Sequence, residues 1–161
     1  MNAFEIAMKM ETDSIQFYTE AARKTKCAAG KKMFLTVTED EKRHLEMISQ
    51  LIKGMNITVK DVSPMKQVKT VFESMKDEMM MKVEATKDEL EAFKIAMRME
   101  HEGEAFYKKS LAAAKTDKEK ALFERLIEEE RQHYRIFSNT YQFLADTGNW
   151  FMWSEYSIVE G

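Results

Sequence analysis

Apolar residues recur at steps of three and four along four long stretches of the chain, the spacing that gives a helix one apolar face. The stretches cover roughly residues 2–27, 30–53, 88–115 and 118–146. The apolar face of the first contains Phe4, Ala7, Met8, Ile15, Tyr18 and Ala22, and that of the second Phe34, Val37, Leu45, Ile48 and Ile52. The pattern predicts four long amphipathic helices.

Helix-start signals support the last two of these helices. Thr86-x-x-Glu89 and Thr116-x-x-Glu119 are capping-box patterns, in which each side chain satisfies a backbone N–H of the other residue. Little interrupts the helices, because the 161 residues include only 5 glycines and 1 proline. Helix-forming residue types dominate the regular segments, which favours an all-α chain.

The connections between the predicted helices differ in length. Only a few residues separate the first helix from the second and the third from the fourth, so residues 2–53 and 88–146 should each form an antiparallel helical hairpin. Residues 54–87 are long enough to carry the chain back along the bundle, since a helix of about 24 residues spans about 36 Å. We therefore predict one all-α domain over residues 1–161, an up-down four-helix bundle with a long crossover and a short tail over 147–161.

Two segments outside these helices carry distinctive side chains. In the crossover, Pro64 favours a lead-in helix over about residues 65–83. We interpret its Met79-Met80-Met81 run as apolar packing, because three adjacent helical residues do not share a face. We expect the aromatic residues of the tail to cap one end of the bundle or contact a second subunit, with stacking on a ligand as the alternative. These aromatic residues are Trp150, Phe151, Trp153 and Tyr156.

Composition and charge exclude several classes of partner. The net charge is −3, and no cluster of Lys and Arg forms the stripe that nucleic acid or an anionic membrane surface would need. No apolar run approaches the roughly 20 residues of a membrane span, and no secretory signal is visible, so we expect a cytoplasmic protein. Cys27 is the only cysteine, which suits a reducing compartment and excludes an intramolecular disulfide, a rubredoxin-type iron site and a zinc ribbon.

Polar residues within the helical stretches repeat. A glutamate followed 30 residues later by Glu-x-x-His occurs twice, 89 residues apart. The two sets are Glu11, Glu41 and His44, and Glu100, Glu130 and His133. Phe17-Tyr18 recurs in the same register as Phe106-Tyr107. The two halves of the chain therefore present the same polar residues on the same helical hairpin.

All six of these residues lie in phase with the apolar face of their helix, so they should point into the core. Four buried carboxylates without partners would carry a prohibitive cost of desolvation and repulsion, so either several stay protonated or cations sit among them. Two divalent ions would balance four carboxylates, and a neutral histidine would complete the shell of each ion. In Glu-x-x-His both side chains can reach one ion, while the second glutamate oxygen bridges to another.

One Glu from each of two helices and Glu-x-x-His from each of the other two is the ligand set of di-metal carboxylate bundles. We therefore predict a site for two metal ions in the core. Carboxylate and imidazole suit iron, manganese and zinc alike, so the ligand types leave the metal open.

Several further residues lie close to the predicted site. Tyr18 and Tyr107 come seven residues after the single glutamates, so their hydroxyls either donate to a ligand carboxylate or to peroxide, or find another buried acceptor as core tyrosines. Asp40 and Glu129 either accept the second ring N–H of a ligand histidine from another helix or are surface charges. His101 directly follows a predicted ligand and points about 100° away from it, which favours a surface or interface position over a metal or proton-relay role.

The two-fold pattern Glu…Phe-Tyr…Phe…Glu-x-x-His resembles the rubrerythrin and ferritin-like di-iron superfamily, most closely the rubrerythrin di-iron domain, over about residues 3–146. The resemblance implies a ferritin-like bundle with two iron ions, in which Glu41 and Glu130 bridge. The iron ligands that it implies are Glu11, Glu41, His44, Glu100, Glu130 and His133. Family members reduce hydrogen peroxide at a diferrous site, or oxidise ferrous iron with dioxygen or peroxide.

The chain departs from this pattern in two places. Full-length rubrerythrins carry a rubredoxin domain that supplies electrons, and this chain lacks its cysteines, so we expect a separate donor such as a rubredoxin-type protein. Rubrerythrins also have an additional glutamate three residues after the third-helix ligand, where this chain has Gly103, with Ser14 at the equivalent place in the first half. We expect a more symmetric site, like that of bacterioferritin, where these small residues either open space for a substrate or permit close helix packing.

These features together predict a two-electron reduction of hydrogen peroxide or dioxygen by two ferrous ions. Tyr18 and Tyr107 are the expected catalytic residues, which would orient the oxygen species. Two alternatives stay open, namely a ferroxidase that handles iron and a non-catalytic protein that holds zinc or manganese. Bundles of this kind often pair, so a homodimer is expected.

Overall fold

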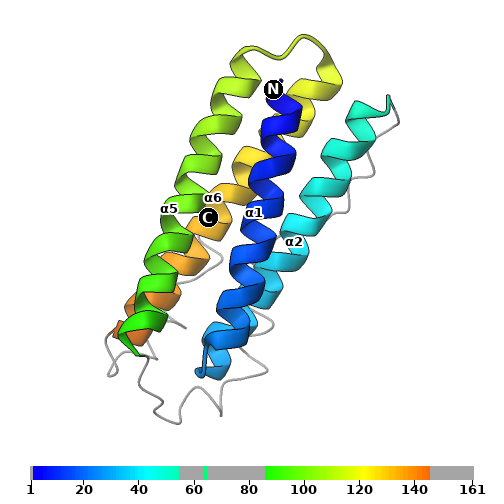
Figure 1. Ribbon diagram of the computed structural model, residues 1–161. Coiled ribbons are helices and arrows are strands. Elements are labelled where there is room, and N and C mark those ends of the chain that lie inside the picture. The colour runs from blue at the N-terminus through cyan, green and yellow to red at the C-terminus, as the bar shows by residue number, and fades with distance from the viewer. Residues whose placement is uncertain (1, 55–63, 65–85, 146–161) are drawn as a thin grey trace.

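The computed structural model describes residues 2–54, 64 and 86–145, and within them the chain forms four long helices packed side by side (Figure 1). The helices are α1 (Ala3–Lys24), α2 (Ala28–Ile52), α5 (Lys87–Ala112) and α6 (Asp117–Ala145). The predicted all-α four-helix bundle is confirmed, and every helix boundary lies within three residues of its predicted place.

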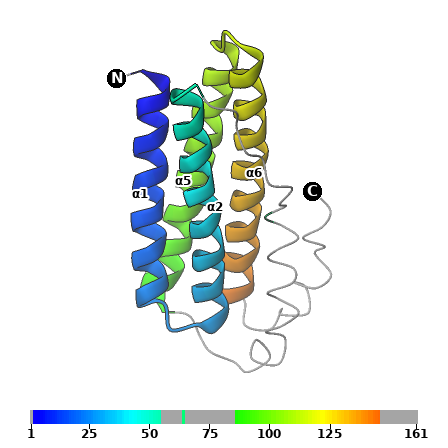
Figure 2. The ribbon, with the colours of Figure 1, turned by 90° about the vertical axis from the view of Figure 1, so that its right-hand side faces the viewer.

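The topology of the bundle follows from the unequal connections. Each hairpin is antiparallel, and across the bundle α1 packs on α5 and α2 packs on α6. α2 finishes at one end of the bundle while α5 begins at the other (Figure 2). Most of the crossover predicted over residues 54–87 lies outside the described residues, as do Met79–Met81 and the aromatic tail.

Capping interactions set where α5 and α6 begin. The Thr86 hydroxyl accepts from the Glu89 N–H at 3.1 Å, and the Glu89 carboxylate accepts from the Thr86 N–H at 3.0 Å. Thr116 and Glu119 make the same reciprocal pair at 3.1 and 3.3 Å. Both predicted capping boxes are therefore present. α5 ends at Ala112, earlier than predicted, because the residues up to Thr116 form the turn that caps α6.

The turn between α1 and α2 is tied to the other hairpin. Thr25 has an extended backbone, which ends α1 at Lys24, before the predicted end of the helix. The Lys26 N–H donates to the buried Glu89 carboxylate at 2.6 Å, so the residue that caps α5 also holds this turn. Cys27 is buried at the N-cap of α2, where it acts as a small residue at a helix junction.

Two apolar clusters fill the bundle, one towards each end. The first includes Tyr18, Phe34, Phe93 and Phe137, and the second includes Tyr107, Phe123, Leu126 and Ile48. The clusters follow the internal repeat: the Tyr18 and Phe34 rings lie 6.0 Å apart, and their counterparts Tyr107 and Phe123 lie 6.1 Å apart. The middle of the bundle, between the two tyrosines, is therefore the place where the repeated polar residues meet.

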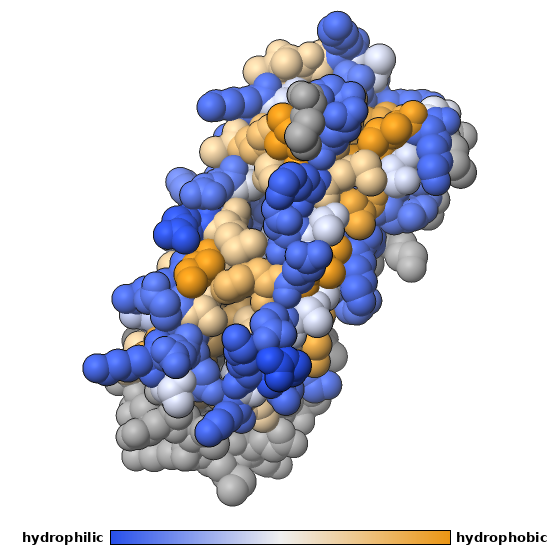
Figure 3. Space-filling view, in the orientation of Figure 1, coloured by the Kyte–Doolittle hydropathy of each residue, from blue (hydrophilic) through white to orange (hydrophobic). Residues whose placement is uncertain are grey.

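Charged residues cover the outside, with apolar side chains showing between α1 and α5 on the face seen in Figure 3. Ile52 was predicted on the inner face of its helix but is 50% exposed, because it is the last residue of α2. Within the described part of the chain, no helix combines the length and the apolar character that crossing a membrane requires.

Phe34 and Leu35 offer a matched test of the core, since Phe34 is fully buried and Leu35 is 43% exposed. We expect Phe34→Ala to lower the free energy of unfolding by about 3–5 kcal/mol, because it removes a large buried ring and leaves a cavity. Leu35→Ala should change it by less than about 0.5 kcal/mol. Urea denaturation followed by circular dichroism measures both values, and similar losses in the two variants would contradict this core.

Candidate metal centre

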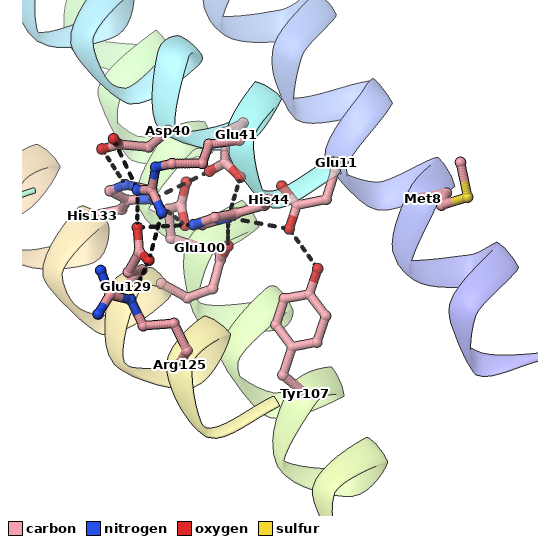
Figure 4. A network of polar contacts seen from close by, with 12 residues as sticks. Met8, Glu11, Asp40, Glu41, His44, Glu100, Tyr107, Arg125, Glu129 and His133 are labelled. Carbon is pink, nitrogen blue, oxygen red and sulfur yellow. Dashed lines mark hydrogen bonds and ion pairs between the residues drawn. The ribbon is translucent and has the colours of Figure 1, made fainter. Parts of the chain in front are cut away.

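The six side chains that the repeat singles out meet at the centre of the bundle (Figure 4). They form two groups of four, and within each group one ligand-capable atom per residue lies within 4.8 Å of the others. The groups are Glu11, Glu41, His44 and Glu130, and Glu41, Glu100, Glu130 and His133. All six residues are buried, with no more than 4% of their surface exposed. Glu41 and Glu130 belong to both groups, as side chains that reach two ions must.

The local sequence explains why these polar groups face inward. Glu11 lies one turn after buried Ala7 and two turns before buried Tyr18, so the three share the inner face of α1. Glu41 likewise follows buried Val37 by one turn on α2. Because the chain repeats, the equivalent residues of α5 and α6 have the same helical phase as those of α1 and α2. Burial of the apolar neighbours therefore carries the carboxylates and imidazoles into the core.

Several inward atoms of this cluster have no hydrogen-bond partner in the described part of the chain. These buried atoms are Glu11 Oε2, Glu41 Oε1, Glu100 Oε2, Glu130 Oε1 and His133 Nδ1. Buried polar atoms in native proteins are almost always satisfied, so five unsatisfied ones in a single place need a common explanation. Carboxylate oxygens and an imidazole nitrogen are donors that iron, manganese and zinc accept, so the residues fit a two-metal site.

Each histidine is oriented by a carboxylate from the facing helix (Figure 4). The distance from His44 Nε2 to Glu129 Oε1 is 3.0 Å, and that from His133 Nε2 to Asp40 Oδ2 is 2.9 Å. A carboxylate only accepts, so each Nε2 is the donor, and Nδ1 is the ring atom that faces the cluster. Asp40 and Glu129 are buried, so they are partners of the histidines and not surface charges.

The two tyrosines bond to the glutamates of the opposite half. The Tyr18 hydroxyl donates to Oε1 of Glu100 at 2.6 Å, and the Tyr107 hydroxyl donates to Oε1 of Glu11. In both glutamates the other oxygen, Oε2, is the one without a partner. Each tyrosine therefore holds one carboxylate oxygen and leaves the second available to an ion. A role of the tyrosines towards an oxygen species stays a prediction.

Two arginines that the sequence reasoning missed lie beside the carboxylates that orient the histidines. Arg43 donates to Asp40 at 3.2 Å and through Nη1 to Glu129 at 3.0 Å. Arg125 donates to Glu129 at 2.7 Å (Figure 4). The counterpart of Arg43 in the second half is Gln132, so a comparison of the halves gave no signal for this residue. The outer layer of the cluster is thus less symmetric than its centre.

Protons stabilise the central glutamates when no ion is bound. Burial raises the pKa of Glu41 and of Glu130, and the nearby charge of Glu100 raises both further. Burial also raises the pKa of Tyr18 and Tyr107 well above the usual tyrosine value, and adjacent carboxylates add to this. These shifts favour the protonated forms of the two shared glutamates and of both tyrosines in the metal-free protein.

The histidines pair with the remaining carboxylates in the metal-free protein. Burial alone would lower the pKa of His44, but the charge of Glu11 outweighs it and raises that pKa; His133 behaves in the same way beside Glu100. Burial would raise the pKa of Glu100, but the charge of His133 brings it down to about 2. Two imidazolium–carboxylate pairs and two neutral glutamic acids leave this cluster of six uncharged.

The structure shows the surroundings of His101 and Gly103, two residues that follow Glu100 on α5. His101 is exposed, with its ring 6.1 Å from that of Tyr134, so it lies on the surface and away from the cluster. Gly103 is buried, and a Cβ built on it would lie 2.9 Å from Oε2 of Glu130. Of the two interpretations of this glycine, the structure favours close packing over open space.

Comparisons with known proteins agree with this geometry. The family model described as Rubrerythrin matches residues 2–141, a range that contains all six central side chains. The solved structure of a hypothetical protein from Pyrococcus furiosus is similar at 22% identity, with a TM-score of 0.63, over 89% of this chain and 88% of that one. At this identity the likeness shows the fold alone. A search of curated proteins gave no match.

The pKa shifts predict how the stability of the metal-free protein depends on pH. Above the ordinary glutamate pKa of 4.5, the folded state retains protons on Glu41 and Glu130 that the unfolded chain releases, and above 6.5 it also retains those on His44 and His133. Stability should therefore fall as the pH rises above about 5, and the fall should steepen above about 6.5.

At acidic pH the stability should instead fall as the pH falls, because the charge of Glu100 is lost as the pH approaches its pKa of about 2. Thermal unfolding of chelator-treated protein at a series of pH values measures the curve, which should peak near about pH 5. A melting temperature that rises steadily from pH 5 to 8 would contradict this distribution of protons.

Proposed function

The chain belongs to the rubrerythrin family, and on that basis we propose that its central cluster holds two iron ions and reduces hydrogen peroxide or dioxygen. The observation that carries the proposal is the set of buried carboxylate and imidazole atoms without a hydrogen-bond partner in the described residues. These atoms belong to two groups that share two glutamates, the arrangement needed by two neighbouring ions with bridging carboxylates.

The proposed ligands divide evenly between the ions. Glu11 and His44 would hold one ion, Glu100 and His133 would hold the other, and Glu41 and Glu130 would be shared between the two. In the metal-free cluster, two glutamic acids and two imidazolium rings each retain a proton. Two divalent ions would replace the positive charge of these protons. Metal loading therefore releases protons, and the affinity for metal rises with pH, opposite to the stability of the metal-free protein.

Two ferrous ions supply the two electrons that reduce one hydrogen peroxide to two waters, with the uptake of two protons. The residues of the chain provide the setting for this chemistry. Tyr18 and Tyr107 keep their protons at neutral pH and stand at opposite ends of the cluster. They hold Glu100 and Glu11 in place, and the same hydroxyls orient the oxidant as it arrives.

Reduction of the oxidised ions requires an electron donor. The chain has one cysteine, which is too few for the four-cysteine iron site of a rubredoxin. We propose that a separate rubredoxin-type protein delivers the electrons, and that the bundle works as a homodimer.

A specific observation favours ferrous-iron oxidation as the second candidate function. Gly103 replaces the additional glutamate that distinguishes rubrerythrins, and the two groups of four are equivalent under the internal repeat. A symmetric site of this kind resembles that of bacterioferritin. The two candidates differ in whether ferrous ions remain as cofactors or pass through the site as substrate.

A pair of glutamates on α6 tests the ligand assignment. Glu130 is 4% exposed at the cluster, whereas the Glu128 side chain is 53% exposed on the opposite side of the same helix. Glu130→Ala should lower metal content from two ions per chain to one or fewer, because both ions lose a ligand, and Glu128→Ala should leave it unchanged. Inductively coupled plasma mass spectrometry of the purified variants measures the metal content per chain. Equal metal content in the two variants would refute the assignment.

Stopped-flow absorbance tests the reaction itself. Anaerobic protein loaded with ferrous iron should be oxidised by one equivalent of hydrogen peroxide per two iron ions, at least about tenfold faster than free ferrous ion. Repeated cycles with a reductant should keep the iron bound if it is a cofactor, whereas a ferroxidase would release or store it. If peroxide oxidised the bound iron no faster than free ferrous ion, the peroxidase proposal would be contradicted. Zinc in protein from the native host would favour a non-catalytic role.

A further inference from the structure

The two histidines of the cluster donate to outer carboxylates that are held in different ways (Figure 4). His133 Nε2 donates to Oδ2 of Asp40 at 2.9 Å, and His44 Nε2 donates to Oε1 of Glu129 at 3.0 Å. These distances are nearly equal, so the two rings are placed alike. The difference lies in the other bonds of the two acceptor oxygens, and Arg43 on α2 causes it.

Arg43 binds Glu129 through two nitrogens of its guanidinium group. Nη1 donates to Oε2 at 3.0 Å, and Nη2 donates to Oε1, the same oxygen that accepts the ring proton of His44. Arg125 adds a bond from Nε to Oε2 at 2.7 Å. Both oxygens of Glu129 therefore lie against guanidinium groups, and His44 shares its acceptor atom with Arg43.

The bonds to Asp40 are divided differently between its two oxygens. Arg43 Nη2 donates to Oδ1 at 3.2 Å, whereas His133 donates to Oδ2. Asp40 and Glu129 are both buried, so solvent screens the charges around them only weakly. The oxygen that accepts from His133 is thus separate from the oxygen that Arg43 binds, unlike the oxygen that accepts from His44.

This difference reaches the metal-facing side of each ring. A carboxylate that accepts one ring N–H of a histidine raises the basicity of that histidine as a ligand. An acceptor oxygen that also bonds to a guanidinium group draws the ring proton less strongly, because part of its charge is already engaged. Nδ1 of His44 should therefore be a weaker donor to an ion than Nδ1 of His133.

We propose that Arg43 is a positioning residue that makes the two ions of the cluster unequal, so that the ion beside His133 is held more tightly than the ion beside His44. The proposal rests on the two-metal function proposed above. The six central residues cannot cause this inequality, because they are the same in both halves. The position equivalent to Arg43 in the second half is Gln132, which brings no positive charge.

Two variants isolate the ions one at a time. Glu11→Ala removes a ligand of the ion beside His44, and Glu100→Ala removes the equivalent ligand of the ion beside His133. The pair is matched, since each glutamate accepts from a tyrosine of the opposite half. In calorimetric titrations with Co²⁺, Glu11→Ala should bind its remaining ion about tenfold more tightly than Glu100→Ala does. Equal affinities or the reverse order would overturn the proposal.

Arg43→Gln, added to each of these two variants, tests whether this arginine causes the difference. It introduces the residue found at the equivalent position and should narrow the difference between the two affinities. Arg131→Gln is the control, because it removes the same charge from the outside of α6, where the Arg131 side chain is 52% exposed and bonds to Glu104. The control should leave the difference unchanged. An Arg43→Gln change that alters both affinities equally would make Arg43 an ordinary structural residue.

Nuclear magnetic resonance observes the same contact without altering a ligand, and it decides the question if a variant fails to fold. In wild-type protein loaded with two Zn²⁺ ions and ¹⁵N-labelled histidine, the Nε2 proton of His133 should resonate further downfield than that of His44, because its hydrogen bond is stronger. Arg43→Gln should move the His44 resonance towards that of His133. Coincident resonances in the wild type would overturn the proposal.

The titrations also separate this inference from the function on which it rests. If the wild type binds two Co²⁺ ions and the two single-ion variants have equal affinities, the inequality is wrong and the two-metal function stands. If the wild type fails to bind two Co²⁺ ions, the two-metal function falls, and this inference falls with it.

Discussion

This helical bundle buries four carboxylates in its core, and their burial dictates which side chains surround them. Each ionised carboxylate loses its hydration, and each repels the others at short range. The cluster persists only if positive charge enters it. In the metal-free protein that charge comes from protons on the histidines and the two shared glutamates. Two divalent ions meet the same requirement, so charge balance and the proposed function have one physical origin.

The surroundings of the cluster are arranged to hold its members still. Tyr18 and Tyr107 close it at the two ends, each anchored in an aromatic cluster and bonded to a glutamate of the opposite half. At the sides, Asp40 and Glu129 orient the histidines, and Arg43 joins these two acids. Four of the six central residues, Glu11, Glu100, His44 and His133, therefore have a second group that fixes their orientation.

The two halves of the chain differ at some of the positions around the central cluster. The six central residues are the same in both halves, whereas Arg43 has Gln132 as its counterpart in the repeat and Gly103 has Ser14. The first difference gives the carboxylate partners of the histidines a shared cation, and the second lets Glu130 lie against its neighbouring helix. Both differences lie around the six central residues and leave the identity of those six unchanged.

The four helices, their caps and the identity of the clustered residues could all be predicted from the amino-acid sequence, because helical phase is a local property. A glutamate in phase with Ala7 and Tyr18 must face the core whatever the core contains. Only the tertiary structure decided that Tyr18 bonds to Glu100 of the other half, that Arg43 spans two acids and that Glu130 rests against Gly103. Those contacts depend on which helices face each other and how closely they approach, and packing between distant segments sets both.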